Sequence, residues 1–231
     1  MLIDNCIKFH NPKDKERLFQ RTSLGSQSKV LTEWKHLLET STKEQDIHAF
    51  LELHPELLPG LYDLHNGPLH GIIVSKFPFG ADYVSDFAFV TRHSMATQFT
   101  FVEIEDPAKP IFNKDGSFSQ KFNQARQQIA DWKLWVSKNS QVLVDMFSPM
   151  FKTYNAWDDY KDFKFYLVYG RRNEVMQDKK QKERWSSILV NNENGISIMS
   201  YDRLQIEEDV KDRLIVCSYQ DQAFYAKSEV I

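Results

Sequence analysis

The chain has little cysteine, no long apolar run and no large excess of charge of either sign. Two cysteines, Cys6 and Cys217, lie at opposite ends of the 231 residues, and neither belongs to a CxxC or zinc-ligand spacing. We therefore expect reduced thiols rather than a disulfide. No stretch approaches the roughly 20 apolar residues of a membrane-spanning helix, and the N-terminus lacks the basic and apolar regions of a signal peptide. These absences predict a soluble, cytoplasmic protein without a membrane partner.

The charge balance and the missing motifs exclude several classes of function. A formal net charge of −3 excludes a polycation whose overall charge attracts nucleic acid. Any contact with nucleic acid must therefore come from a local basic face. The sequence also lacks a Walker A loop, a GxGxxG motif and a GxSxG motif, which argues against P-loop nucleotide hydrolysis and serine hydrolase chemistry. Hydrophobic residues make up 42% of the chain, which is enough for a sizeable core.

The residue pattern divides the chain into a short polar arm and one folded domain. Residues 1–27 are polar and weakly patterned, which predicts a flexible N-terminal arm. Residues 28–231 switch between helical and strand periodicity, which predicts a mixed α/β domain with helix and strand additions at its C-terminal end. We expect helices from residue 30, from 42 to about 55, at 117–138 and at 175–190, strands at 69–76, 83–90, 99–105, 163–169 and 196–200, and a turn at 77–80.

Two of the predicted strands carry carboxylates among apolar residues. Asp86 lies in one strand, and Glu103 and Glu105 lie in the other, where the alternation of side chains points them to the same face. A carboxylate in an apolar strand is costly unless it is paired, hydrated or bound to a metal. Asp86, Glu103 and the backbone carbonyl of Ile104 are therefore candidate ligands for Mg²⁺, which prefers oxygen and keeps several waters. Glu105 lies where it can bind metal or hold an attacking water.

Each of these residues also has a simpler structural interpretation. The three carboxylates are compatible with a solvated face of the sheet. Glu52, on the second predicted helix, belongs either to a second layer around the metal or to an ordinary exposed helix surface. Gln128, on the long helix predicted at 117–138, either approaches the site or lies on the solvated surface beside the buried apolar face of that helix. The basic cluster from Arg171 to Arg184 is either a phosphate-binding face or a charged helix surface.

Several short segments between about residues 45 and 205 occur in an order that is typical of one protein family. The segments are FLELHPELL (50–58), FPFG (77–80) leading to SDF (85–87), FVEIE (101–105) with a following proline, Ala125 with Gln128, Asp131 and Trp132, VYGRR (168–172), and ISI (196–198) before Tyr201-Asp202. The ordered set resembles the Shedu anti-phage defence proteins, whose effector domain is a PD-(D/E)xK nuclease.

The resemblance implies a restriction-endonuclease-like core, an α/β fold with a mixed central sheet flanked by helices. It implies that Asp86 is the metal-binding aspartate and that Glu103 is the acidic residue of the (D/E)xK element. Gln128 resembles the helix glutamine that supports the site or the DNA in related nucleases. Glu52 is expected to support the site as well.

The chain departs from the family pattern at one position. That pattern usually has a lysine two residues after the glutamate, and this sequence has Glu105 there. Some restriction endonucleases of the superfamily also carry glutamate at this place, where the carboxylate acts on the water or on a second metal. Lys109 or Lys121 is an alternative source of positive charge. We expect both lysines to contact DNA, together with Arg171 and Arg172.

The resemblance therefore predicts a Mg²⁺- or Mn²⁺-dependent endonuclease of bacterial defence that cleaves double-stranded DNA and assembles into a homo-oligomer. Two alternatives remain open. The first is a catalytically inactive nuclease-like module that binds DNA or a partner protein, which the missing lysine favours and which Mn²⁺ binding tests. The second is a phosphodiesterase for a small nucleotide, whose binding would depend weakly on salt because few phosphates are contacted.

Overall fold

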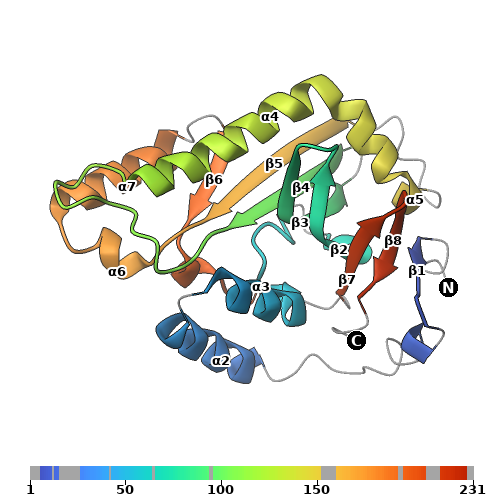
Figure 1. Cartoon of the computed structure of the whole chain (residues 1–231), viewed down its shortest axis with the longest axis horizontal. Helices are drawn as coiled ribbons and strands as arrows, with labels where there is room; N and C mark the ends of the chain where they lie inside the picture. The colour runs from blue at the N-terminus through green and yellow to red at the C-terminus, as the bar shows by residue number, and fades with distance from the viewer. Residues whose placement is uncertain are drawn as a thin grey trace.

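The computed structural model describes residues 6–11, 13–15, 27–41, 43–63, 66–93, 96–151, 160–191, 195–206 and 214–227. Within these ranges an eight-stranded sheet runs through the centre in the order β1-β8-β7-β2-β3-β4-β5-β6 (Figure 1). Its strands are β1 (Ile7–Lys8), β2 (Pro68–Phe79), β3 (Tyr83–His93), β4 (Ala96–Ile104), β5 (Tyr160–Val168), β6 (Ile196–Met199), β7 (Ile215–Gln220) and β8 (Ala223–Ala226). Helices flank this sheet, which confirms the predicted mixed α/β architecture.

The middle of the sheet is an antiparallel meander of β2, β3 and β4. Branched and aromatic residues dominate these segments and favour strands because they pack well on a pleated surface. β4 then pairs in parallel with β5, and β5 with β6. In the β3–β4 ladder Phe87 lies opposite Val102. Asp86 precedes Phe87, and Glu103 follows Val102. The antiparallel register therefore places Asp86 and Glu103 opposite each other.

Helices cover both faces of the sheet. They are α2 (Gln27–Thr40), α3 (Glu44–Leu53), α4 (Gln120–Met146), α5 (Ser148–Phe151), α6 (Arg172–Val175) and α7 (Lys179–Asn191), with short 3-10 turns η2 (Pro55–Leu57) and η4 (Tyr201–Arg203). The long helix α4 crosses one face, and α2 and α3 lie against the other (Figure 1). The Ser119 side chain caps α4 by accepting a hydrogen bond from the backbone N–H of Phe122 at 3.1 Å.

Each face of the sheet has its own apolar core. The α4-side core includes Phe77, Phe79, Phe101 and Trp132, all fully buried. The α3-side core includes Trp34, Ile47, Leu51, Phe87 and Val102. The two cores lie on opposite sides of β2, β3 and β4, so the meander is held from both sides. The carboxylates of Asp86 and Glu103 therefore project from a rigid support.

The predicted turn at residues 77–80 is wrong for its first three residues. β2 continues through them, with Phe77 opposite Ser85 and Phe79 opposite Tyr83, and the chain turns at residues 80–82 instead. Pro78 is tolerated because, among the described residues, β7 pairs with β2 at Ile72–Val74 and not at Pro78, which therefore lies on an edge segment of β2. The hairpin of β2 and β3 is therefore longer than the sequence pattern predicted.

Other elements also differ in extent from the predictions. α4 begins and ends later than the predicted helix at 117–138, and β7 and β8 form a hairpin where the sequence showed only an apolar run at 214–217. Within residues 1–27, Ile7–Lys8 pairs in parallel with β8, and much of the rest of this segment lies outside the described residues.

Both cysteines are buried, and neither forms a disulfide. Burial raises the pKa of the Cys217 thiol. In the described parts of the chain, no helix combines the length and the apolar character needed to cross a membrane.

Candidate active site

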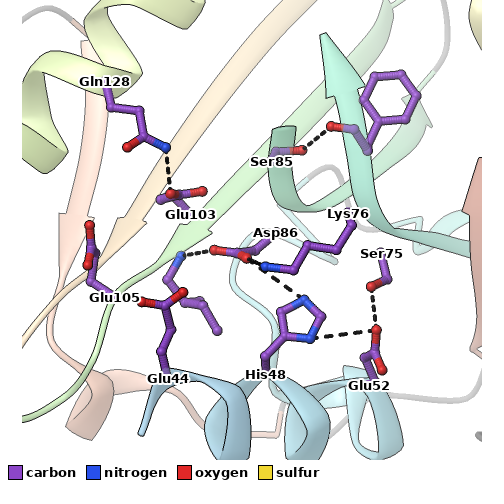
Figure 2. Close-up of polar contacts among 12 residues, drawn as sticks. Glu44, His48, Glu52, Ser75, Lys76, Ser85, Asp86, Glu103, Glu105 and Gln128 are labelled. Carbon is purple, nitrogen blue, oxygen red and sulfur yellow. Dashed lines mark hydrogen bonds and ion pairs between the residues drawn. The ribbon is translucent and has the colours of Figure 1, made fainter. Parts of the chain in front are cut away.

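Asp86 and Glu103 form the centre of the candidate site, and both are buried. The Asp86 Oδ2 atom accepts a hydrogen bond from the backbone N–H of Ile104 at 2.8 Å, which fixes β3 against β4. The Glu103 Oε1 atom accepts a hydrogen bond from Gln128 Nε2 on α4 at 2.7 Å (Figure 2). The structure therefore brings Gln128, which the resemblance expected to support the site or the DNA, into contact with Glu103.

The electrostatics of this pair are unfavourable without a cation. Burial raises the pKa of Glu103 well above its usual value, and the negative charge of Asp86 raises it further. The second oxygen, Glu103 Oε2, is buried and has no hydrogen-bond partner among the described residues. A buried carboxylate oxygen without a hydrogen-bond donor costs folding free energy, and a cation at this position would supply the missing interaction.

The donor set fits a small oxygen-preferring cation. In the described part of the chain, no three Asp, Glu, His or Cys side chains come together in an arrangement that holds a metal. A metal here would take Asp86, Glu103, the backbone carbonyl of Ile104 and water, which suits Mg²⁺ or Mn²⁺ because these ions keep several waters. The free Glu103 Oε2 atom is the observation that supports this fit.

Helix α3 contributes one face of acidic and imidazole side chains to the site. Glu44, His48 and Glu52 are spaced four residues apart, so they lie above one another along the helix. The His48 ring stacks on Phe87 with centroids 4.7 Å apart, and its Nε2 atom lies 3.8 Å from Asp86 Oδ1. Burial lowers the pKa of His48, so this ring is a neutral neighbour of Asp86 at pH 7.

Glu52 reaches the site through His48 rather than directly. Its Oε1 atom lies 3.6 Å from His48 Nδ1 and 2.5 Å from Lys227 Nζ, and it accepts a hydrogen bond from Ser75. Burial opposes ionisation, but the hydrogen bonds from Lys227 and Ser75 outweigh it and lower the pKa of Glu52. Glu52 therefore ties α3 to β2 and to the chain after β8. The structure places it as a second layer around Asp86, one of the two expected alternatives.

Glu105 lies just after β4 and interacts with Lys109. The Lys109 ammonium binds the Glu105 carboxylate and lies 3.7 Å from Glu44 Oε2. The backbone carbonyl of Glu105 accepts a hydrogen bond from the Tyr201 hydroxyl. Burial raises the pKa of Glu44, and the Asp86 and Glu105 carboxylates raise it further. Glu105, Lys109 and Glu44 thus form a charged rim beside Asp86.

Lys76 is the main site residue that the sequence reasoning missed. It lies on β2 opposite Asp86, and its ammonium donates a hydrogen bond to Asp86 Oδ1. Burial opposes the charged form, but the Asp86 carboxylate outweighs it and raises the pKa of Lys76. The hairpin register would have identified Lys76 from the sequence, because a turn at residues 80–82 pairs residue 76 with residue 86. The wrong turn at 77–80 concealed it.

The predicted DNA-contacting residues have different surroundings. The Arg171 guanidinium donates to both Asp202 carboxylate oxygens, at 2.9–3.2 Å, and to the backbone carbonyl of Leu38. The backbone N–H of Arg172 also donates to Asp202 at 2.6 Å. Arg171 therefore holds η4 to α2. Lys121 is exposed on the first turn of α4.

Comparison with known families matches most of the chain. The family model described as Shedu protein SduA, C-terminal, matches residues 41–205, a range that contains α3, the β2–β4 meander, α4 and every residue of the Asp86–Glu103 pair and its partners except Lys227. Comparison with curated proteins gives no match.

Proposed function

Because the chain belongs to the Shedu SduA C-terminal family, whose membership suggests a role in anti-phage defence, we propose that it is a metal-dependent DNA endonuclease. The observation that carries this proposal is the buried pair of Asp86 and Glu103 on adjacent strands, with one Glu103 oxygen that accepts no hydrogen bond from the described residues. A restriction-endonuclease-like PD-(D/E)xK core is part of the same proposal.

The protein's own side chains would prepare the reacting position. Asp86, Glu103 and the Ile104 carbonyl would hold Mg²⁺ or Mn²⁺, which polarises the scissile phosphate and lowers the pKa of the attacking water. Gln128 holds one Glu103 oxygen, so the other would be available to the ion. The Ile104 N–H fixes Asp86 in the same way through Oδ2. Glu105 would orient the water or bind a second ion.

Double-stranded DNA is the proposed substrate, and self-assembly into a homo-oligomer is proposed from the family resemblance. Lys109 lies beside Glu105, and Lys121 lies at the start of α4. Arg172 is the first residue of α6. These residues would contact phosphates, whereas the Arg171 side chain is already bound to Asp202. Neutralising several phosphates makes DNA affinity fall steeply with salt, which distinguishes DNA from a small nucleotide.

A second candidate is a nuclease-like module that binds DNA or protein without cutting. The observation that favours it is the glutamate at position 105, where the resemblance expects lysine. In this alternative the Lys76–Asp86 and Lys109–Glu105 ion pairs neutralise the carboxylates, and no metal binds.

The experiment that separates the two is a calorimetric Mn²⁺ titration followed by plasmid cleavage, with Asp86→Ala beside wild type. The endonuclease proposal predicts Mn²⁺ binding and cleavage, both lost in Asp86→Ala. A matched control is Asp46→Ala, on the exposed start of α3, which should retain both. An Asp86→Ala protein that cleaves as fast as wild type would contradict the proposal, and a wild-type protein that binds no Mn²⁺ would favour the module.

A further inference from the structure

We propose that Lys76, supplied by β2, provides the positive charge at the reacting phosphate that position 105 does not supply. This inference rests on the proposed nuclease function and assigns one further catalytic residue to it. The ammonium group of Lys76 would contact the scissile phosphate and the attacking water. It would stabilise the negative charge that develops there in the transition state.

The strand register places Lys76 at the site. Ser75 pairs with Phe87 and Phe77 with Ser85, so Lys76 lies directly across from Asp86 in the hairpin. Its ammonium donates to Asp86 Oδ1, the same oxygen that lies 3.8 Å from His48 Nε2. Asp86 Oδ2 is already held by the Ile104 N–H. The lysine therefore contacts the Asp86 oxygen that no backbone N–H of the described residues holds, and its own side chain is exposed to solvent.

The backbone at Lys76 is unusual for a lysine in a strand. Its φ of +50° is in the left-handed region, which residues other than glycine rarely adopt. Strict alternation would put Val74 and Phe77 on opposite faces, yet both belong to the α4-side core. Alternation is thus broken at Lys76. Such strain is retained where the surrounding structure needs the side chain in one place.

The other lysines near the site are less suitable. Lys109 is bound to Glu105 and lies close to Glu44. Lys227 is bound to Glu52, behind His48. Lys121 precedes Gln128 by seven residues, which is about 10 Å along a helix axis. Lys76 is nearest to the carboxylate pair, and its side chain is about half exposed (52%), so its ammonium can leave Asp86 and reach a bound strand.

This geometry predicts a signature that a purely structural ion pair would not produce. A metal ion held by Asp86 would compete with Lys76 for Oδ1, because Oδ2 is already bound by the Ile104 N–H. Removing the ammonium should therefore leave Mn²⁺ binding unchanged or tighter while it slows cleavage. A lysine that only positions Asp86 would instead weaken Mn²⁺ binding when it is removed.

The test uses the 231-residue chain with Lys76→Asn, because asparagine tolerates a positive φ and keeps the backbone conformation. Single-turnover plasmid cleavage is measured at saturating Mn²⁺, and Mn²⁺ affinity is measured by calorimetry. We expect cleavage to slow by about 100-fold or more, the effect typical of losing one preorganised charge-stabilising group, with affinity equal to or tighter than wild type. Lys76→Arg, which keeps the charge, should restore part of the rate.

A matched control is Lys164→Met, which removes another strand lysine paired with a carboxylate, Asp63, outside the site. It should cleave at the wild-type rate. Two outcomes overturn the inference while the nuclease function stands: Lys76→Asn cleaving within a few-fold of wild type, or Lys76→Asn losing Mn²⁺ binding. Wild-type protein that does not cleave would instead overturn the nuclease function, and the inference with it.

Discussion

The two faces of the β2–β4 meander differ in what they bury. On the α4 side the core is apolar and includes many aromatic contacts, as in Phe79 with Trp132 at 5.0 Å and Phe77 with Phe147 at 4.7 Å. One polar contact there between strand and helix is that of Gln128 with Glu103. Such packing fixes side chains because dense interiors tolerate little displacement.

On the α3 side, charged and polar groups gather at the end of the sheet. Helix α3 presents Glu44, His48 and Glu52 toward the residues of β2 and β3 (Figure 2). Most of these groups are ion-paired, and their pKa values are shifted by burial and by one another. The comparison indicates that the apolar α4 side holds the strands in place, whereas the α3 side carries the ionisable groups whose protonation can change.

The largest predicted effect comes from the aromatic side. Trp132→Ala removes a fully buried indole that packs on Phe79, so we expect the free energy of unfolding to fall by about 3–5 kcal/mol. Leu134→Ala, on the exposed surface of the same helix, should change it by less than about 0.5 kcal/mol. Urea denaturation measures both values. Equal losses in the two variants would contradict the assignment of rigidity to this core.

Gln128→Leu tests the hydrogen bond that joins α4 to Glu103 of the candidate site. The change leaves both oxygens of Glu103 without a hydrogen bond from the described residues, so we expect a loss of about 1–3 kcal/mol in stability. Mn²⁺ affinity should fall as well, because Glu103 is no longer oriented. Gln127→Leu, which removes an exposed hydrogen bond to Asp131, is the matched control. A Gln128→Leu protein with unchanged Mn²⁺ affinity would remove Gln128 from the site.

Glu103→Gln should stabilise the protein near pH 7 in the absence of metal. Because burial and Asp86 raise the pKa of Glu103, the folded state holds a proton that the unfolded state has lost. Wild-type stability therefore falls as pH rises from the unfolded pKa of about 4.3 toward the raised folded pKa. Glutamine carries no charge and avoids this loss, and its carbonyl can still accept from Gln128.

The measurement for Glu103→Gln is thermal denaturation at pH 4 and pH 7 with a chelator present. We expect a melting temperature a few degrees above wild type at pH 7, on the scale of roughly 2–4 °C per kcal/mol for a chain of this size. At pH 4 the two proteins should melt together. A variant that is less stable than wild type at pH 7 would show that the carboxylate is compensated by contacts other than those described.

The smallest predicted effect concerns Lys227. Lys227→Met removes one hydrogen-bond donor from the buried Glu52 carboxylate while Ser75 remains bound, so we expect a loss of about 1 kcal/mol. Cleavage should slow only a few-fold, because Glu52 acts on Asp86 through His48. The Lys164→Met protein provides the comparison for a lysine pair outside the site. A cleavage loss as large as that of Asp86→Ala would place Lys227 in the site itself.

The spacing of apolar residues was sufficient to predict the helices and strands in which that spacing is long and regular. The helical stripe from Phe122 to Val136 is buried as predicted, and the strands around Asp86 and Glu103 form where alternation and β-branched residues favour them. The short edge strand Ile7–Lys8 and the hairpin partner β8 could not be predicted, because two to four residues carry no period.

The site depended on information that lies between segments. That Glu103 and Asp86 adjoin follows from the β3–β4 register, and that Lys76 faces Asp86 follows from a turn displaced by a few residues. Contact between His48 and Asp86 depends on how α3 packs on the sheet, which its own spacing does not specify. Gln128 was found through the family resemblance, because a glutamine beside a buried stripe has no distinctive pattern of its own.

The most direct test of the central claim is cleavage of linear and supercoiled plasmid with Mg²⁺ or Mn²⁺, wild type beside Glu103→Ala. The account predicts metal-dependent cleavage by wild type and its loss in the variant, with both proteins folded by circular dichroism. Metal-dependent cleavage that persists in Glu103→Ala would contradict the account, because the chemistry would then lie outside the Asp86–Glu103 pair.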